Sequence, residues 1–192
     1  ALDLLFSQIV LRLPERERQI LMALSVLRSP APAHNWQQGT TADALTNLVA
    51  QGFVQTDRQG GLDLSLVYRQ LLLHHLDEAT SRQLHQQAAV LRSQTGAYTE
   101  AAYHLVEAGQ PEAALALWRE YGAQEIAQGQ AATALALFQH VQRLTLAPAA
   151  HDQATLICAQ LQHLTGQPSL AATTLSSLLG KTPILTVEAA EL

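Results

Sequence analysis

Few residues of this sequence have the types and spacing that chemistry needs. Gly180-Lys181-Thr182 matches the last three residues of a phosphate-binding Walker A loop. That loop also needs a glycine at the position of Leu175 and a preceding strand, and the sequence offers neither. We therefore expect the end of a helix here, with Gly180 as its C-cap and Lys181 near its negative end.

The eight histidines raise the question of a metal site. His74 and His75 are adjacent and would point to different faces of a helix, and no two histidines have the i, i+4 spacing of a helical metal site. The others stand apart, among them His104, His140 and His163. We expect ordinary surface or core histidines, no metal and no cofactor.

The nucleophiles and carboxylates are equally scattered. Cys158 falls on an apolar stripe with Ala154, Ile157, Leu161 and Leu164, where a small buried residue is expected. The acidic residues with the most suggestive positions are Glu107, Glu112, Glu120 and Glu125. On helices they would lie on solvated polar faces more often than in an acid and base pair. We expect no catalytic residue, and the enzyme class is the least supported.

Composition limits the remaining classes. The chain has 192 residues, is rich in Leu and Ala, and has one cysteine, so a folded helical protein without disulfides is expected. No apolar run approaches the roughly 20 residues that cross a bilayer. We expect a cytoplasmic protein that does not contact a membrane. Because the sequence starts at Ala1 rather than Met, we also expect it to be part of a longer protein.

A short phrase recurs and defines the second half of the chain. Residues 109–118 read GQPEAALALW, residues 129–138 read GQAATALALF, and residues 166–175 read GQPSLAATTL. In the first copy Ala114, Leu117, Trp118 and Tyr121 follow the i, i+3, i+4, i+7 spacing of an amphipathic helix. Small alanines beside one large ring predict closely stacked helices.

The first half has a different order. Helical spacing is expected over residues 2–13, then after Pro14 with Ile20 and Leu24 buried, and again over residues 42–51 with Thr41 as N-cap and Gly52 as C-cap. Residues 53–56 and 62–66 surround a Gly60-Gly61 turn and predict a hairpin. Helices followed by a hairpin predict a winged-helix domain at residues 1–76.

From residue 77 onward every segment reads as helix. We expect helices over residues 79–95, 98–108, 111–121, 123–128, 131–145, 149–165 and 168–179. Helices of this length with short turns pack as antiparallel neighbours and continue as a solenoid. The prediction is a mainly α chain with a tetratricopeptide-like helical array over residues 77–192.

A family resemblance rests on several of these segments. Residues 13–27 (LPERERQILMALSVL), 45–54 (LTNLVAQGFV), 84–89 (LHQQAA) and 101–109 (AAYHLVEAG) resemble the region after the nucleotide-binding domain of STAND-class signalling ATPases. In that family, which includes transcription activators, a winged helix precedes tetratricopeptide-like repeats. The resemblance implies an upstream nucleotide-binding domain in the same parent chain as a partner. It carries over no nucleotide chemistry, because the ATPase core is absent from this sequence.

The winged helix raises the question of DNA. Its third helix offers Asp43, Thr46, Asn47 and Gln51 but no lysine or arginine, and the hairpin turn adds Arg58 beside an aspartate. Residues 1–76 are electrically neutral, and the net charge of −5 lies in the second half. Phosphate binding needs a basic excess, so DNA binding through residues 42–58 is the weaker interpretation.

The prediction for function is a non-catalytic sensor or scaffold part of a larger signalling ATPase or transcriptional regulator. A protein domain or small effector would bind the repeat surface, where such solenoids bind their partners. The ring candidates are Trp118, Phe138, Tyr121, Tyr98 and Tyr103; Trp118 and Phe138 are expected in the core first. The alternatives are a DNA-binding regulator and a free-standing interaction module.

Overall fold

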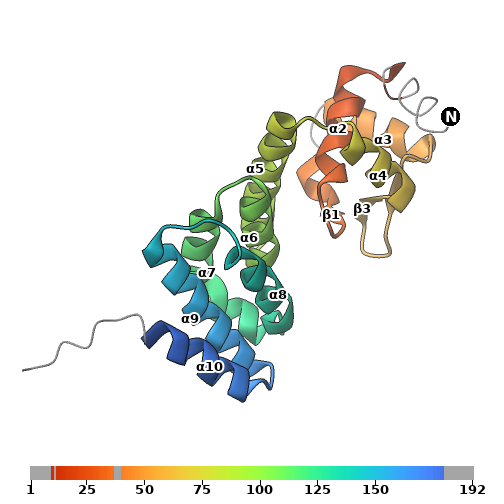
Figure 1. The fold of residues 1–192 in the computed structure, drawn as a ribbon. Coiled ribbons are helices and arrows are strands. Elements are labelled where there is room, and N and C mark those ends of the chain that lie inside the picture. Colours follow the sequence, from red (N-terminus) through yellow and green to blue (C-terminus); the bar gives the residue numbers. More distant parts are fainter. Residues whose placement is uncertain (1–9, 11, 37–39, 180–192) are drawn as a thin grey trace, which may run out of the picture. The chain divides into compact units, whose positions relative to one another are not determined.

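A computed structural model describes residues 10, 12–36 and 40–179 (Figure 1). This described part is mainly helical and contains nine α-helices, one short 3-10 helix and three short strands, so the mainly α fold class is confirmed. Contacts divide the chain into two compact units: unit 1 comprises residues 1–96 and 107–109, and unit 2 comprises residues 97–106 and 110–192. These contact-based units do not test the domain boundary predicted between residues 76 and 77, which stays a prediction.

Unit 1 begins with two helices that share one core. Helix α2 (Glu15–Ser25) begins directly after Pro14, because proline is tolerated at the start of a helix but not in its interior. Glu15 and Glu17 lie in its first turn, near the positive end of the helix. Helix α3 spans Thr40–Ala50. Ile20, Leu21 and Leu48 are at most 2% exposed and lie in one core cluster with the strand residues Leu62 and Leu64.

The predicted hairpin is confirmed and belongs to a three-stranded antiparallel sheet. Strands β2 (Val54–Thr56) and β3 (Gly61–Leu64) pair with Val54 opposite Leu64 and Thr56 opposite Leu62. The third strand, β1 (Ala31–Pro32), pairs with β3 on its other side, giving the order β1-β3-β2. Proline is tolerated in β1 because this is an edge strand.

The helix and strand boundaries of unit 1 differ in part from those expected from the sequence. Thr41 is not the N-cap of α3, because the helix already includes Thr40. Helix α2 ends at Ser25, several residues before Pro30 and Pro32. The two residues of β1 were not predicted, because two residues are too few for a periodic pattern. Most of the helix expected over residues 2–13 lies outside the described residues.

Two arginines fasten the last helices of unit 1. From α4 (Leu66–His74), the Arg69 guanidinium donates to the carbonyls of Leu24 and Ser25 at the end of α2, at 3.5 and 3.4 Å, and to Asp63 at 2.5 Å. From α5 (Glu78–Gln94), Arg92 donates to the carbonyls of Ser29 and Pro30 at 2.5 and 3.2 Å. The Leu24 carbonyl also accepts from the Leu27 backbone nitrogen at 3.3 Å. The arginines add charge-assisted hydrogen bonds to the carbonyls at the end of α2 and in the turn after it, and these bonds hold α4 and α5 in place.

Unit 2 contains the remaining helices, namely α6 (Tyr98–Glu107, whose last residue belongs to unit 1), α7 (Pro111–Ala127), α8 (Ala131–Val141), α9 (Pro148–Leu164) and α10 (Pro168–Leu179). The turns before the phrase helices use glycines with positive φ, at +83° in Gly129 and +80° in Gly166. Side chains with a Cβ rarely adopt this conformation, so the glycine of each phrase stops one helix before the next begins.

One predicted break does not occur. Residues 111–121 and 123–128 were expected to be two helices, but α7 runs without interruption to Ala127. Gly122 does not end the helix. It is buried, and a Cβ at this position would lie 2.8 Å from Cε2 of Trp118. Gly122 is therefore glycine because the indole ring lies on its backbone, a reason that the sequence pattern does not reveal.

Glu125 of α7 is a capping residue in this unit. Its carboxylate is 2% exposed and accepts hydrogen bonds from the backbone nitrogens of Tyr98 and Thr99 at 3.2 and 2.8 Å. These nitrogens begin α6 and have no partner within that helix. Glu125 was expected on a solvated face, and this expectation is wrong, because the carboxylate stabilises the positive end of a helix distant in sequence.

The packing of Gly122 can be tested by Gly122→Ala. Alanine would gain about 1 kcal/mol of helix propensity, but overpacking against the indole costs about 1–3 kcal/mol. The second effect should win, so the variant should unfold at lower urea concentration. Trp118 fluorescence in a Trp36→Phe background would report unit 2 alone. A variant more stable than its parent would contradict the packing described for Trp118.

Candidate functional site

The cysteine considered as a nucleophile, and expected in the core, is not activated. Cys158 on α9 is fully buried, and burial raises the pKa of its thiol to about 12. The thiolate is the reactive form, so this residue is not activated at neutral pH. Its prediction as a core residue is confirmed by its place in the core cluster of unit 2. The Walker-like residues Gly180, Lys181 and Thr182 lie outside the described residues.

The histidines are spread over both units. His74 and His75 are exposed at the end of α4, whereas His85 on α5 and His104 on α6 are buried, at 7% and 0% exposure. Within residues 10, 12–36 and 40–179, no three His, Cys, Asp or Glu side chains gather as metal ligands would. The histidines therefore define no common site in the part of the chain that the structure describes.

The predicted ring candidates separate into two groups. Trp118 and Phe138 are 3% and 0% exposed with ring centroids 5.2 Å apart, so their prediction as core residues is confirmed. Tyr98 and Tyr121 stack in parallel at 3.9 Å and are half-buried. A hydrogen bond to the neighbouring Glu120 carboxylate raises the pKa of the Tyr121 hydroxyl. The stacked tyrosine pair links α6 to α7.

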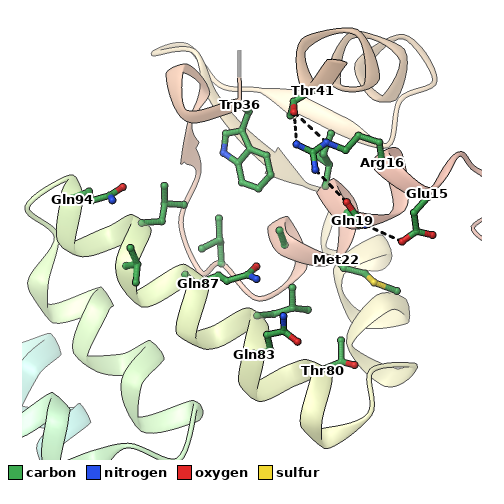
Figure 2. Close-up of a pocket in the computed structure, with 17 residues that line it drawn as sticks. Glu15, Arg16, Gln19, Met22, Trp36, Thr41, Thr80, Gln83, Gln87 and Gln94 are labelled. Carbon is green, nitrogen blue, oxygen red and sulfur yellow. Dashed lines mark hydrogen bonds between the residues drawn. The ribbon is translucent and has the colours of Figure 1, made fainter. Parts of the chain in front are cut away.

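Unit 1 contains a hollow of about 980 Å³ between α2 and α5, here named the α2–α5 groove (Figure 2). Figure 2 shows Trp36, Arg16 and Gln19 on one side and a row of polar side chains along α5 on the other. The row consists of Thr80, Gln83, Gln87 and Gln94. These residues follow helical spacing, so they form one stripe, with the exposed Val90 among them.

The wall of the groove on α2 is a connected polar network. Arg16 donates to Thr41 Oγ1 at 2.6 Å and to Gln19 Oε1 at 3.2 Å, and Gln19 donates to Glu15 Oε1 at 3.0 Å. Glu15 also pairs with Arg18. Both charged residues that line the groove, Glu15 and Arg16, are thus engaged with neighbours. The groove offers amide groups and an indole face, which suit an uncharged ligand better than an ion.

Unit 2 contains a smaller hollow of about 440 Å³ between α7 and α9, here named the α7–α9 groove. Its apolar lining includes Ile126 and Leu156, and Leu156 is 49% exposed. Gln153 also lines the groove and donates to the carbonyl of Leu115 at 3.3 Å. Gln160 and Arg119 add further polar groups to the lining. A hollow lined by apolar side chains and a few polar groups is the general form of a small-ligand site.

The sequence pattern did not identify either groove. The stripe from Thr80 to Gln94 was visible as i, i+3, i+7 spacing, but it reads as an ordinary solvated helix face until α2 and Trp36 are placed opposite. Likewise Leu156 is one of several leucines on its helix. Only the neighbouring helix distinguishes it from Leu164, which is equally exposed, at 50%, and does not line the groove.

The side chains considered for DNA readout are partly committed to the fold. Asp43 and Thr46 on α3 and Gln51 directly after it are exposed. Asn47 donates to Glu17 at 3.2 Å, and Glu17 is only 3% exposed, so this amide offsets the desolvation of a carboxylate. Asp57 accepts from the backbone nitrogens of its own turn, at 2.8 and 2.7 Å.

Comparison with known proteins does not assign the chain. No protein-family model, no curated protein and no solved structure matches it. Among the residues that the structure describes, no helix is both long enough and apolar enough to cross a membrane.

The buried imidazole of unit 1 predicts a pH effect on stability. Burial lowers the pKa of His85 below its ordinary value of 6.5, and the Glu107 charge opposes this only in part. The unfolded chain therefore binds more protons, so the free energy of unfolding should be constant above about pH 7 and fall as pH decreases below about 6.5.

His85→Gln should remove this acid slope, whose limit is about 1.4 kcal/mol per pH unit for one group. Chemical denaturation at several pH values measures it. His140→Gln replaces an exposed histidine and is the matched control, which should keep the slope. The same slope in wild type and His85→Gln would show that another group is responsible.

Proposed function

We propose that this chain is a non-catalytic sensor or scaffold part of a larger regulator of the STAND-type signalling ATPase kind. In this proposal unit 1 is built around a winged helix, and the helices that follow form a tetratricopeptide-like array that binds a protein segment or small effector. The observation that carries the proposal is the α7–α9 groove, where Leu156 is half-exposed on a surface formed by two repeat helices.

Several observations support the architecture in this proposal. The order of α2, α3 and the β2–β3 hairpin, with β1 as the third strand, is the order of a winged helix. In the repeat region, glycine turns separate helices of the same phrase, as in a solenoid. The resemblance of residues 13–145 to the segment after a nucleotide-binding domain supplies the parent protein class. The single cysteine fits a reducing cytoplasm as its location.

A mechanism follows if ligand binding favours one arrangement of the parent protein over another. A ligand can shift such an equilibrium only by its difference in affinity for the two arrangements. A groove formed by two helices suits this role, because its width depends on how these helices pack. The chain would then transmit occupancy of the groove to the domain beside it.

The groove can be tested with Leu156→Glu and the matched control Leu164→Glu. Both leucines are on α9 and are 49% and 50% exposed, but only Leu156 lines the groove. Peptides selected from a displayed random library on the wild-type chain should lose affinity about tenfold or more for Leu156→Glu, because a charge replaces an apolar contact. They should keep their affinity for Leu164→Glu.

Fluorescence anisotropy with the selected peptides measures this difference. Failure to enrich any peptide, or an equal loss of affinity in both variants, would contradict a binding role for the α7–α9 groove. Far-UV circular dichroism of the two variants shows whether each keeps the helical content of the wild type.

A DNA-binding regulator is the second candidate, favoured by the exposed polar side chains of α3 next to a hairpin that carries the exposed Arg58. If it is correct, duplex DNA should bind at low salt, and the affinity should fall as salt rises. Arg58→Ala should weaken binding, whereas Arg143→Ala, an exposed residue of unit 2, should not. No mobility shift at low salt would exclude this candidate.

A further inference from the structure

One positive charge lies in the α7–α9 groove without a counterpart. Of the described residues that line the groove, only Arg119 carries a charge. It is exposed, and among the residues that the structure describes it has no hydrogen bond and no ion pair. Its own helix offers no acid to pair with it, because the positions three and four residues away hold Leu115, Ala116, Gly122 and Ala123. The N–H donors of the guanidinium are therefore available to a ligand.

The surroundings of Arg119 favour an ion pair more than an open surface does. On the opposite wall Leu156 is half-exposed, and Ile126 adds apolar surface further along α7. Apolar groups beside a charge exclude water and reduce screening, so an anion held here is attracted more strongly than at a fully solvated arginine. The groove therefore favours a ligand that has both an apolar part and a negative charge.

The groove lies within the row of helices and not at its end. Helices α7 and α9 lie side by side (Figure 1), α6 and α8 precede them in the chain, and α10 follows α9. In a stacked array each repeat contacts only its neighbours. A further repeat would therefore pack beyond the α9–α10 pair and leave this groove open.

Two glutamine side chains of α9 indicate that the ligand also has N–H groups. Gln153 donates through its amide nitrogen to the carbonyl of Leu115 at 3.3 Å, which leaves its Oε1 as an acceptor at the groove. Gln160 is exposed at the other end of the same wall and offers a second amide. A peptide supplies backbone N–H groups to such acceptors, whereas a simple aliphatic acid does not. The chemistry of the groove thus fits a peptide that carries a carboxylate.

The length of the groove limits this peptide to a few residues. On α9 the lining runs from Gln153 to Gln160, which corresponds to about 10 Å of helix. An extended chain advances roughly 3.4 Å per residue, so about three residues fit. Alternate side chains of an extended chain point the same way, so an acidic residue and an apolar residue two positions apart can face the same wall.

We infer that the α7–α9 groove binds a short extended peptide segment in which an Asp or Glu side chain pairs with Arg119 and an apolar residue two positions away packs on Leu156. A C-terminal carboxylate suits the groove less well, because such groups are held by free backbone N–H groups. The lining residues of α7 and α9 lie in helix interiors, where these groups bond within the helix. This inference rests on the proposed function, because it names the ligand of the same groove.

The probes are the peptides selected on the wild-type chain for the Leu156→Glu comparison. They should share an acidic residue two positions from an apolar one. Arg119→Gln should weaken their binding about fivefold or more in fluorescence anisotropy, because an ion pair beside apolar surface is lost. Arg143→Gln is the matched control. It removes the same charge from another exposed arginine of unit 2 that does not line the groove, so the affinity should be kept.

An amide in place of the peptide's acid, Asn for Asp or Gln for Glu, tests the pairing itself. This change should weaken binding to the wild type by the same factor and should have no further effect on Arg119→Gln, since both changes remove one interaction. Amidation of the peptide's C-terminus should leave the affinity unchanged. Glutamine is as good a helix former as arginine, so Arg119→Gln should keep the circular dichroism spectrum of the wild type.

The results separate this inference from the proposed function. Peptides that depend on Leu156 but bind Arg119→Gln and Arg143→Gln equally would overturn the inference and leave the proposed function standing. A loss of affinity on C-terminal amidation, with none on replacing the acid, would also overturn the inference, because the bound carboxylate would be the terminal one. If no peptide is enriched, or if the peptides do not depend on Leu156, the inference and the proposed function both fail.

Discussion

Unit 2 depends on one packing constraint, the close approach of helix backbones at the fifth residue after each phrase glycine. Ala114, Ala134 and Ala171 occupy this position and are 0%, 0% and 5% exposed. A larger side chain there would separate the helices and empty the space that Trp118 and Phe138 fill. Because protein interiors are close-packed, small residues and large rings have to alternate, and the repeated phrase supplies this alternation in each helix.

Unit 1 depends on a different interaction, in which arginines satisfy backbone carbonyls. Arg69 and Arg92 reach the carbonyls at the end of α2 and in the following turn, and both side chains lie largely inside the unit. Charge-assisted hydrogen bonds to such groups are strong. They also withdraw positive charge from the surface.

The two grooves share a chemical character. Amides, aliphatic side chains and an indole make up most of their lining, beside Glu15 and Arg16 in the α2–α5 groove and Arg119 in the α7–α9 groove. Surfaces of this kind bind mainly by shape and by hydrogen bonding to neutral groups, and their affinity responds little to salt. The buried Cys158 adds no reactivity, since its thiol stays protonated at neutral pH.

The sequence alone determined the features that depend on local periodicity. The phrase helices, the glycine turns between them, the hairpin and the burial of Trp118 and Phe138 all follow from spacing and turn chemistry. Tertiary structure decided the rest, because it depends on residues far apart in the chain. Glu125 caps a helix that begins 27 residues earlier. Gly122 is a glycine inside a continuous helix because the Trp118 ring leaves no room for a side chain. Gln87 lines a groove only because α2 lies opposite. No local pattern records which side chains will meet, so these roles could be assigned only once the helices were placed.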